Sequence, residues 1–331
     1  MRIPAGKPWI SAFPPARKVI AENRFCVYYL HVTRKYSTIS RKQDIGRLIN
    51  QLHREEFLAV GIMDTGTVED LTAALDWFVN NFNYCLHVVS QTDRFSIEEM
   101  QSRYPDVTFI VFPKAPSLAE RVNALADVCM ATYFLTMRSD TNLMNFDWKP
   151  LEAKMKEDEH PAMICPRIFN KSNEEIPAVR APHIENKDVN PLSFMPASPC
   201  CANLYPFLGI GLYDRALFQR LRGYDESISG AYWQTLDFGT RCWLYGYPIY
   251  TMSDMAVLFF GKQFLIEDRT EVQGFERFYS KALSVRQVKG RNFIRKAPRM
   301  SSKVINEEVR PRLGLYKTDF SSLCENWKNP E

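Results

Sequence analysis

The sequence predicts an α/β protein with a mixed, mainly parallel sheet flanked by helices. Short apolar runs alternate with amphipathic segments from residue 57 to residue 140. Strand followed by helix, repeated along the chain, gives right-handed crossovers and a parallel sheet. The apolar run Phe134–Met137 ends abruptly in the polar cluster Arg138–Thr141, as a buried strand does. Because ligands of open α/β sheets bind beyond the carboxyl ends of the strands, we expect a site at Asp140.

The composition is that of an ordinary folded protein. Of the 331 residues, 46% are apolar and 24% charged, and the formal net charge is +4. This charge is too small to indicate a nucleic-acid partner, since such proteins usually carry a strongly basic face. The eight cysteines form no CxxC pair, which favours reduced thiols and a cytoplasmic location. No apolar run reaches the ~18 residues of a membrane helix.

The spacing of apolar residues predicts the elements of the first half. Residues 1–56 are expected to form a Pro-rich arm, a strand at 25–32 and a helix at 41–56. Strands are then expected at 57–63, 84–89, 107–112 and 131–137, with helices at 68–80 and 117–130 and a short one after Ser96. Ser117 and Glu120 have the spacing of a capping box at a helix start.

The remainder of the chain divides into three stretches. Nine prolines in residues 141–206 predict a long connection, of the kind that carries function or covers a site. A strand at 207–213 and helices at 215–222 and 235–245 follow, and residues 262–299 look helical and basic. We therefore expect an N-terminal region 1–56, a nucleotide-binding domain 57–260 and a basic, mainly helical extension 261–331.

Four segments, in order, resemble the family-2 glycosyltransferases of the GT-A fold. Ser117–Asn123 is similar to the "A-R-N" helix start and Leu135–Thr141 to the "L-D-x-D" segment. Gly209–Glu226 resembles "G-x-x-x-x-R-x-x-F-x-x-x-G-G-F-D-E", and Trp233–Tyr247 resembles "E-D-x-D-x-x-x-R-x-x-x-x-G-Y". The resemblance, over about residues 57–260, implies glycan or polysaccharide biosynthesis from a nucleotide-sugar donor. It also implies a divalent cation, Mn²⁺ or Mg²⁺, and a glycan, lipid-linked or protein acceptor.

The resemblance implies a set of donor-binding residues. Asp140 takes the position of the carboxylate that touches the cation, while Arg138 replaces the first carboxylate of that motif. Arg138 either contacts the diphosphate directly or pairs with Asp140 and closes the site. The other candidate donor-binding residues are Asp64, Asp93, Arg121, Asn123 and Ser139. For three of them a local role is the alternative: a turn for Asp93, a helix surface for Arg121 and a cap for Asn123.

The base motif is also altered. Gln234-Thr235 stands where the family has "E-D", and neither side chain accepts a proton at neutral pH. The candidates for a displaced base are Asp237, Asp225 and Glu226, the last two of which alternatively cap the following turn. Trp233, Gln234 and Arg241 are expected on the acceptor side. Residues 258–261 supply no histidine ligand, so the cation site is expected to be weak or absent.

Two function classes follow from these observations. The first is an active glycosyltransferase, and the second is a non-catalytic GT-A-like module that binds a nucleotide sugar, a glycan or a protein partner. A nucleotidyltransferase would need a Gly-rich, Arg-containing loop where the chain has Met63–Thr67. A dinucleotide oxidoreductase would need a third glycine where the chain has Asp214.

Clustered cations mark the C-terminal part. They are Arg277, Lys281, Arg286, Lys289, Arg291, Arg295, Lys296 and Arg299. They form either a solvated helical face or a contact with an anionic membrane or lipid-linked acceptor, at the inner face of a membrane. The interleaved Phe275, Phe278, Tyr279 and Phe293 are expected to pack the extension onto the core.

Overall fold

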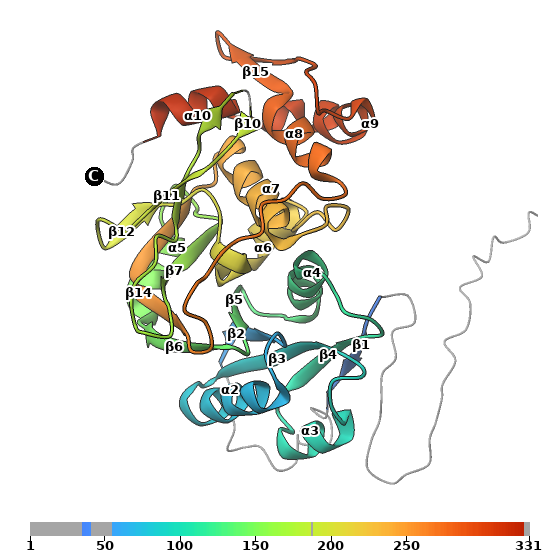
Figure 1. Cartoon of the computed structure of the whole chain (residues 1–331), viewed down its shortest axis with the longest axis vertical. Helices are drawn as coiled ribbons and strands as arrows, with labels where there is room; N and C mark the ends of the chain where they lie inside the picture. The colour runs from blue at the N-terminus through green and yellow to red at the C-terminus, as the bar shows by residue number, and fades with distance from the viewer. Residues whose placement is uncertain (1–34, 41–54, 187, 328–331) are drawn as a thin grey trace, which may run out of the picture.

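A computed structural model describes residues 35–40, 55–186 and 188–327 (Figure 1). The predicted arm and the strand at 25–32 lie outside these residues, as does most of the helix at 41–56. Glu55 and Glu56 belong to strand β2 (Glu55–Met63), so that helix does not reach residue 56.

A ten-stranded mixed sheet forms the centre of the described part of the chain. Its order is β1-β4-β3-β2-β5-β13-β7-β14-β12, with β6 also paired to β14. The strands beside β2 are β1 (Ser37–Ile39), β3 (Tyr84–Gln91), β4 (Thr108–Phe112) and β5 (Tyr133–Arg138). Strand β2 is parallel to β3 and β5, and β3 is parallel to β4, as predicted.

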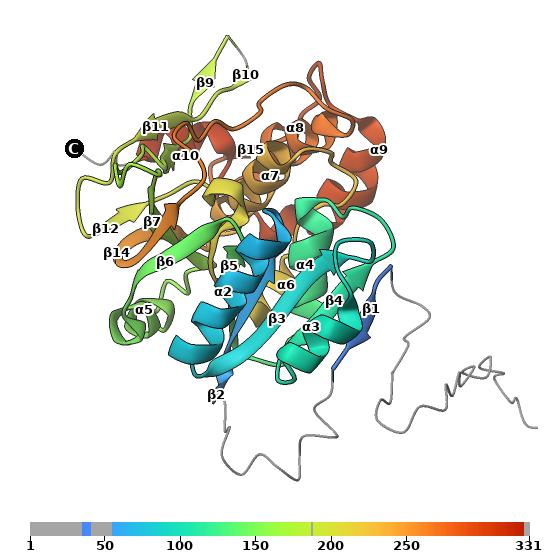
Figure 2. The ribbon, with the colours of Figure 1, turned by 60° about the horizontal axis from the view of Figure 1, so that its bottom comes forward.

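Helices cover both faces of this sheet. They are α2 (Val68–Asn81), α3 (Ile97–Arg103), α4 (Leu118–Val128), α5 (Trp148–Met155), α6 (Arg215–Arg220) and α7 (Ala231–Leu244). Figures 1 and 2 show α2 and α3 on one face of β2, β3 and β4, and α4 on the other. The side chains of β2 alternate between two cores, Leu58 and Val60 packing toward α2 and Ala59 toward α4. The predicted capping box at Ser117 and Glu120 is confirmed.

The Pro-rich connection is more ordered than the sequence predicts. It contributes strands β6 (Thr141–Phe146), β7 (Met163–Phe169) and β12 (Cys200–Ala202) to the main sheet. The short strands β8 (Val179–Ala181), β9 (Ile184–Glu185), β10 (Asp188–Val189) and β11 (Leu192–Phe194) form two small ribbons. The predicted strand at 207–213 begins as a 3₁₀ turn, η1 (Phe207–Gly209), and continues as β13 (Gly211–Asp214), which is followed later by β14 (Ile249–Phe259).

The C-terminal extension combines helices with a hairpin. Its helices are α8 (Phe275–Leu283), α9 (Ser302–Val304), η2 (Ile305–Val309), η3 (Arg310–Leu315) and α10 (Phe320–Asn326). The prediction of helix across 262–299 is wrong at β15 (Val285–Val288) and β16 (Arg291–Ile294), which pair as an antiparallel hairpin. Lys289 and Gly290 between them both have positive φ, the requirement of a two-residue hairpin turn.

The extension packs onto α7. Phe275, Phe278 and Tyr279 surround Trp233, as predicted, whereas Phe293 in the hairpin is 52% exposed. The expected boundaries at 56/57 and 260/261 stay predictions. No helix among the described residues is both long and apolar enough to cross a membrane.

A substitution at Gly239 in α7 tests how closely this helix packs against Leu204 and Tyr205. An added Cβ would overlap the Leu204 carbonyl and would lie 2.6 Å from Tyr205 Cβ. Alanine improves helix propensity by about 1 kcal/mol, but overpacking against backbone costs about 1–3 kcal/mol or more. We therefore predict that Gly239→Ala lowers the free energy of unfolding in urea. In Gly314→Ala, where nothing lies within 4 Å, we expect a change within about 0.5 kcal/mol. Equal effects of the two changes would contradict the close approach.

Candidate functional site

Three strand ends are tied together at the carboxyl edge of the sheet. The Ser139 hydroxyl, just after β5, accepts hydrogen bonds from the backbone N–H groups of Thr65 (3.0 Å) and Gly66 (2.9 Å), just after β2. The Asp64 N–H donates to the carbonyl of Val89 in β3 at 3.0 Å. The ends of β2, β3 and β5 therefore form one fixed surface.

Asp64 is a buried carboxylate with a cationic partner. Its side chain is 1% exposed, and Arg94 donates to it through Nε and Nη2, both at 3.0 Å. The Ser90 hydroxyl donates to the same carboxylate at 2.6 Å. Arg94 comes from the turn after β3, directly after the predicted Asp93, which is itself exposed.

Asp140 is held in the same way by the residue two positions before it. Arg138 donates from Nε to Oδ1 at 2.8 Å and from Nη2 to Oδ2 at 2.7 Å. The Thr65 hydroxyl donates to Oδ1 at 3.1 Å, and Lys262 Nζ lies 3.4 Å from Oδ2. Three hydrogen-bond donors and one further ion-pair partner therefore surround this carboxylate.

These contacts determine the ionisation of Asp140. Burial opposes the charged form, but the hydrogen bonds and charge of Arg138, helped by Lys262 and Thr65, hold the pKa below its ordinary value of 3.8. Of the two interpretations of Arg138, the ion pair with Asp140 is the one present in the structure.

Arg121 is the third arginine at this edge. It reaches back from the first turn of α4, and Nη1 donates to the Asp64 carbonyl at 2.6 Å while Nε donates to the Pro116 carbonyl at 3.2 Å. Burial lowers the pKa of this guanidinium, and the charges of Arg138 and Arg94 oppose the effect of Asp64. Because arginine stays protonated in proteins, Arg121 is a desolvated cation beside two like charges.

The three arginines line an open cleft of about 380 Å³. The remaining lining residues are Asp64, Thr65, Gly66 and Gln91. Nη1 of Arg94, Nη2 of Arg121 and Nη1 of Arg138 make no hydrogen bond to another described residue. A smaller cavity of about 190 Å³, mostly apolar, shares Thr65, Arg121 and Arg138 with the cleft.

The predicted bases lie away from this cleft. The Asp237 side chain is fully buried and paired with Arg241 at 2.9 Å and Lys281 at 2.8 Å. Asp225 pairs with Lys281 at 2.5 Å and Arg277 at 2.8 Å. Burial would raise the pKa of Asp225, but these two cations lower it well below its ordinary value.

Two further predicted residues, Asn123 and Arg241, hold the loop that carries Asp225 and Glu226. Asn123 accepts from the Tyr224 N–H and donates to its carbonyl, both at 2.9 Å, and donates to Glu226 at 3.0 Å. Glu226 also pairs with Lys35 at 2.7 Å. Arg241 donates to the carbonyls of Leu221 and Gly223, so it fixes the start of the same loop.

Gln234 and Trp233, predicted on the acceptor side, are buried in α7. The Gln234 amide oxygen accepts from the Ala119 N–H at 3.0 Å, and its NH₂ group donates to the Ile228 carbonyl at 2.7 Å. The Trp233 indole N–H donates to the Thr270 carbonyl at 2.7 Å. The altered base position therefore joins the start of α4 to α7.

The residues at Asp140 do not fit a divalent cation. Both of its oxygens already accept hydrogen bonds, Lys262 adds a second positive charge beside Oδ2, and Arg138 stands in the place of the motif's first carboxylate. Among the described residues, no group of three His, Cys, Asp or Glu side chains is arranged to hold a metal ion. Sequence reasoning missed Arg94 and Lys262, which come from a turn and from a segment far along the chain.

The pH dependence of stability tests the Arg138–Asp140 pair. A carboxyl with a lowered folded-state pKa stabilises the protein above its ordinary pKa of 3.8, and this contribution is lost as the pH falls through the folded-state value. We predict that Asp140→Asn lowers the free energy of unfolding by about 1–3 kcal/mol near neutral pH, and that this difference shrinks below pH 3.8. The exposed Asp93→Asn is the matched control, and it should change the free energy of unfolding by less than about 0.5 kcal/mol. A pH-independent effect of Asp140→Asn would contradict the pair.

Comparison with known proteins agrees with the fold. No model of a known protein family matches the sequence, and a search of the curated proteins finds no match. The crystal structure of GalNAc-T7 with UDP, GalNAc and Mn²⁺ is similar, with a TM-score of 0.59 and 11% identity over 82% of this chain. The chain spans 56% of that structure. A mannosyltransferase from Pyrobaculum calidifontis, in complex with GDP-Man and Mn²⁺, matches at 12% identity over 70% of this chain and 62% of its own. Its TM-score of 0.41 is too low to support a shared fold. The protein therefore has a GT-A-like fold, as the sequence predicts.

Proposed function

We propose that the protein binds a nucleoside-diphosphate sugar at the cleft and transfers the sugar to an acceptor hydroxyl, with arginines in place of a divalent cation. The observation that carries this proposal is the convergence of Arg94, Arg121 and Arg138, each with one terminal nitrogen available. Guanidinium groups match phosphate oxygens in charge and geometry. With Lys262, four cations face two carboxylates at this edge, and a diphosphate would balance the excess.

The arginines would act in the sugar-transfer step, in which negative charge develops on the departing diphosphate. The bond from the sugar C1 to the diphosphate breaks, the acceptor oxygen bonds to C1, and the departing diphosphate gains negative charge. Fixed donors aimed at such charge stabilise a transition state without reorganisation. Among the described residues that line the cleft and the adjoining cavity, Asp64 is the sole carboxylate, and Arg94 occupies it. We therefore propose that an oxygen of the departing diphosphate accepts the proton of the acceptor hydroxyl.

A second candidate is binding of the nucleotide sugar without transfer. The bonds of Gln234 favour it, because the side chain at the family's base position holds α4 and α7 together. The buried pairing of Asp237 favours it as well, since this carboxylate has two cationic partners and no exposure.

Calorimetric titration with UDP, GDP and their sugars, in EDTA or in Mn²⁺, tests the proposal. We expect equal affinity in the two buffers, and a loss on the order of tenfold in Arg138→Gln. The exposed Arg291→Gln removes the same charge elsewhere and should change nothing. Release of nucleoside diphosphate would favour transfer over binding alone. Binding that requires Mn²⁺ would overturn the proposal.

Arg138→Asp gives a sharper control. It removes the Arg138 hydrogen bonds from both oxygens of Asp140 and restores the two carboxylates of the "L-D-x-D" segment. We expect nucleotide binding by this variant to require Mn²⁺, in contrast to the wild type. A variant that binds equally well in EDTA would show that Arg138 does not take the cation's place.

A further inference from the structure

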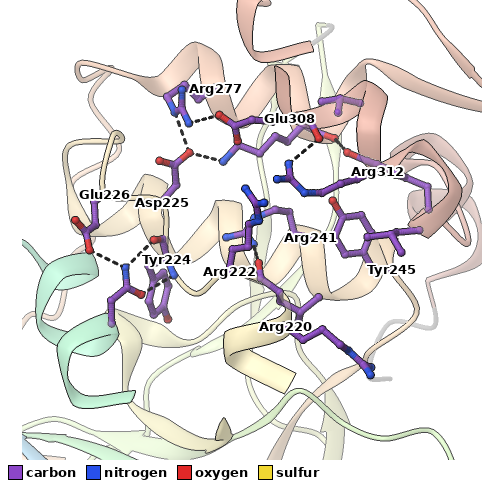
Figure 3. A pocket seen from close by; sticks show the side chains of 16 residues that line it. Arg220, Arg222, Tyr224, Asp225, Glu226, Arg241, Tyr245, Arg277, Glu308 and Arg312 are labelled. Carbon is purple, nitrogen blue, oxygen red and sulfur yellow. Dashed lines mark hydrogen bonds and ion pairs between the residues drawn. The ribbon is translucent and has the colours of Figure 1, made fainter. Parts of the chain in front are cut away.

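A second cavity lies apart from the cleft, on the other side of α4. It occupies about 420 Å³ between the loop at residues 221–230, α7, α8 and the η2–η3 segment (Figure 3). None of its lining residues lines the cleft or the adjoining apolar cavity. Asn123 faces it, whereas Arg121, two positions earlier on α4, lines the cleft, because such an offset turns a helical side chain by about 200°.

The walls of this cavity carry more cations than carboxylates. Its carboxylates are Asp225, Glu226 and Glu308, and its cations are Arg220, Arg222, Arg241, Arg277, Lys281 and Arg312. Ion pairs account for three of the cations: Arg277 with Asp225 and Glu308, Lys281 with Asp225 and Asp237, and Arg241 with Asp237. Arg220 donates to the Tyr247 hydroxyl, and Figure 3 shows it extending away toward the edge.

Arg222 and Arg312 are the two remaining cations of the cavity wall. Neither has an ion-pair partner among the described residues, although Arg312 donates to the Glu308 carbonyl at 2.7 Å. Figure 3 shows both near the middle of the pocket, beside Arg241 and beneath Asp225 and Glu308. Arg222 is exposed and Arg312 is half-buried, so water screens part of the repulsion between them, and an anion between the two guanidinium groups would replace it with attraction.

The backbone at Arg222 adds a second observation. Arg222 has a φ of +67°, a left-handed conformation that residues with a side chain seldom adopt. The Arg241 guanidinium and Asn123 both hold the backbone of the next two residues, so the surroundings impose this conformation. Arg222 directly follows the C-cap of α6, where helices commonly end in this conformation, so the end of α6 fixes the backbone that places Arg222 in the cavity wall.

We propose that this cavity binds a phosphate-bearing anion larger than orthophosphate. Two spare guanidinium groups match the double charge of a phosphate ester, whereas a single carboxylate would balance one of them. The volume falls within the range of small-molecule sites. Leu221, Leu315 and the rings of Tyr245 and Tyr316 supply apolar surface for the rest of the ligand. The proposal is independent of the one for the cleft.

Titration of the full chain with inorganic tripolyphosphate tests this site, at constant ionic strength and without divalent cations. We expect Arg222→Gln/Arg312→Gln to bind at least about tenfold more weakly at this site than the wild type. The matched control Arg291→Gln should bind as the wild type does. Arg138→Gln, which addresses the cleft, should keep this site intact, so the two proposals fail separately.

The same variants also have a readout without ligand. Because the double change removes like-charge repulsion, its thermal midpoint in the absence of phosphate should equal or exceed that of the wild type. If the double variant does not fold, Arg312→Gln alone should still weaken tripolyphosphate binding. Equal affinity of the wild type and the folded variants, or an equal loss in Arg291→Gln, would overturn the proposal.

Vesicles distinguish two sources of the phosphate. Phosphatidylcholine vesicles containing phosphatidic acid should sediment the wild type, and not the double variant, if the ligand is a lipid phosphate. Binding of tripolyphosphate without vesicle binding would support a soluble phosphorylated ligand. Absence of both would overturn the site.

Discussion

The bidentate ion pair between Arg138 and Asp140 decides what the carboxyl edge of this sheet can bind. Arg138 donates to both oxygens of the carboxylate that the family resemblance assigns to a cation, Thr65 donates to one of them, and Lys262 forms an ion pair with the other. Asp64 and Arg94 repeat the arrangement one strand away. The edge therefore carries more cations than carboxylates, which supports the proposal that a diphosphate binds there without a metal ion. In the proposed function Asp140 orients Arg138 and does not itself bind the ligand.

Charged residues of the last two family-like segments, 209–226 and 233–247, hold parts of the fold together. Asp237, Lys281 and Asp225 form one buried network that joins α7, α8 and the loop before α7. Removing one partner from such a network leaves a buried charge and typically costs about 3–5 kcal/mol. Asp225 and Lys281 of this network also line the second cavity, so charges that hold the extension in place lie in the wall of the proposed anion site. The two cationic cavities lie on either side of α4.

Local signals predicted the part of the fold that holds the cleft. Short apolar runs identified β2 to β5, helical spacing identified α4, and the Ser117 capping box fixed where α4 begins. The same reasoning put Asp140 at a strand end. It did not predict Arg94 or Lys262, because their partners are set by tertiary contacts between distant segments. It read β15 and β16 as helix because clustered cations obscured the Lys289-Gly290 turn.

The most direct test of the metal-free account is a crystal grown with a nucleoside diphosphate and Mn²⁺, with anomalous scattering recorded near the manganese edge. The account predicts the diphosphate within hydrogen-bond distance of Arg94, Arg121 and Arg138. It also predicts that the Arg138–Asp140 pair stays closed, with no manganese peak beside it. A manganese ion bound to Asp140, with Arg138 turned away, would contradict the account.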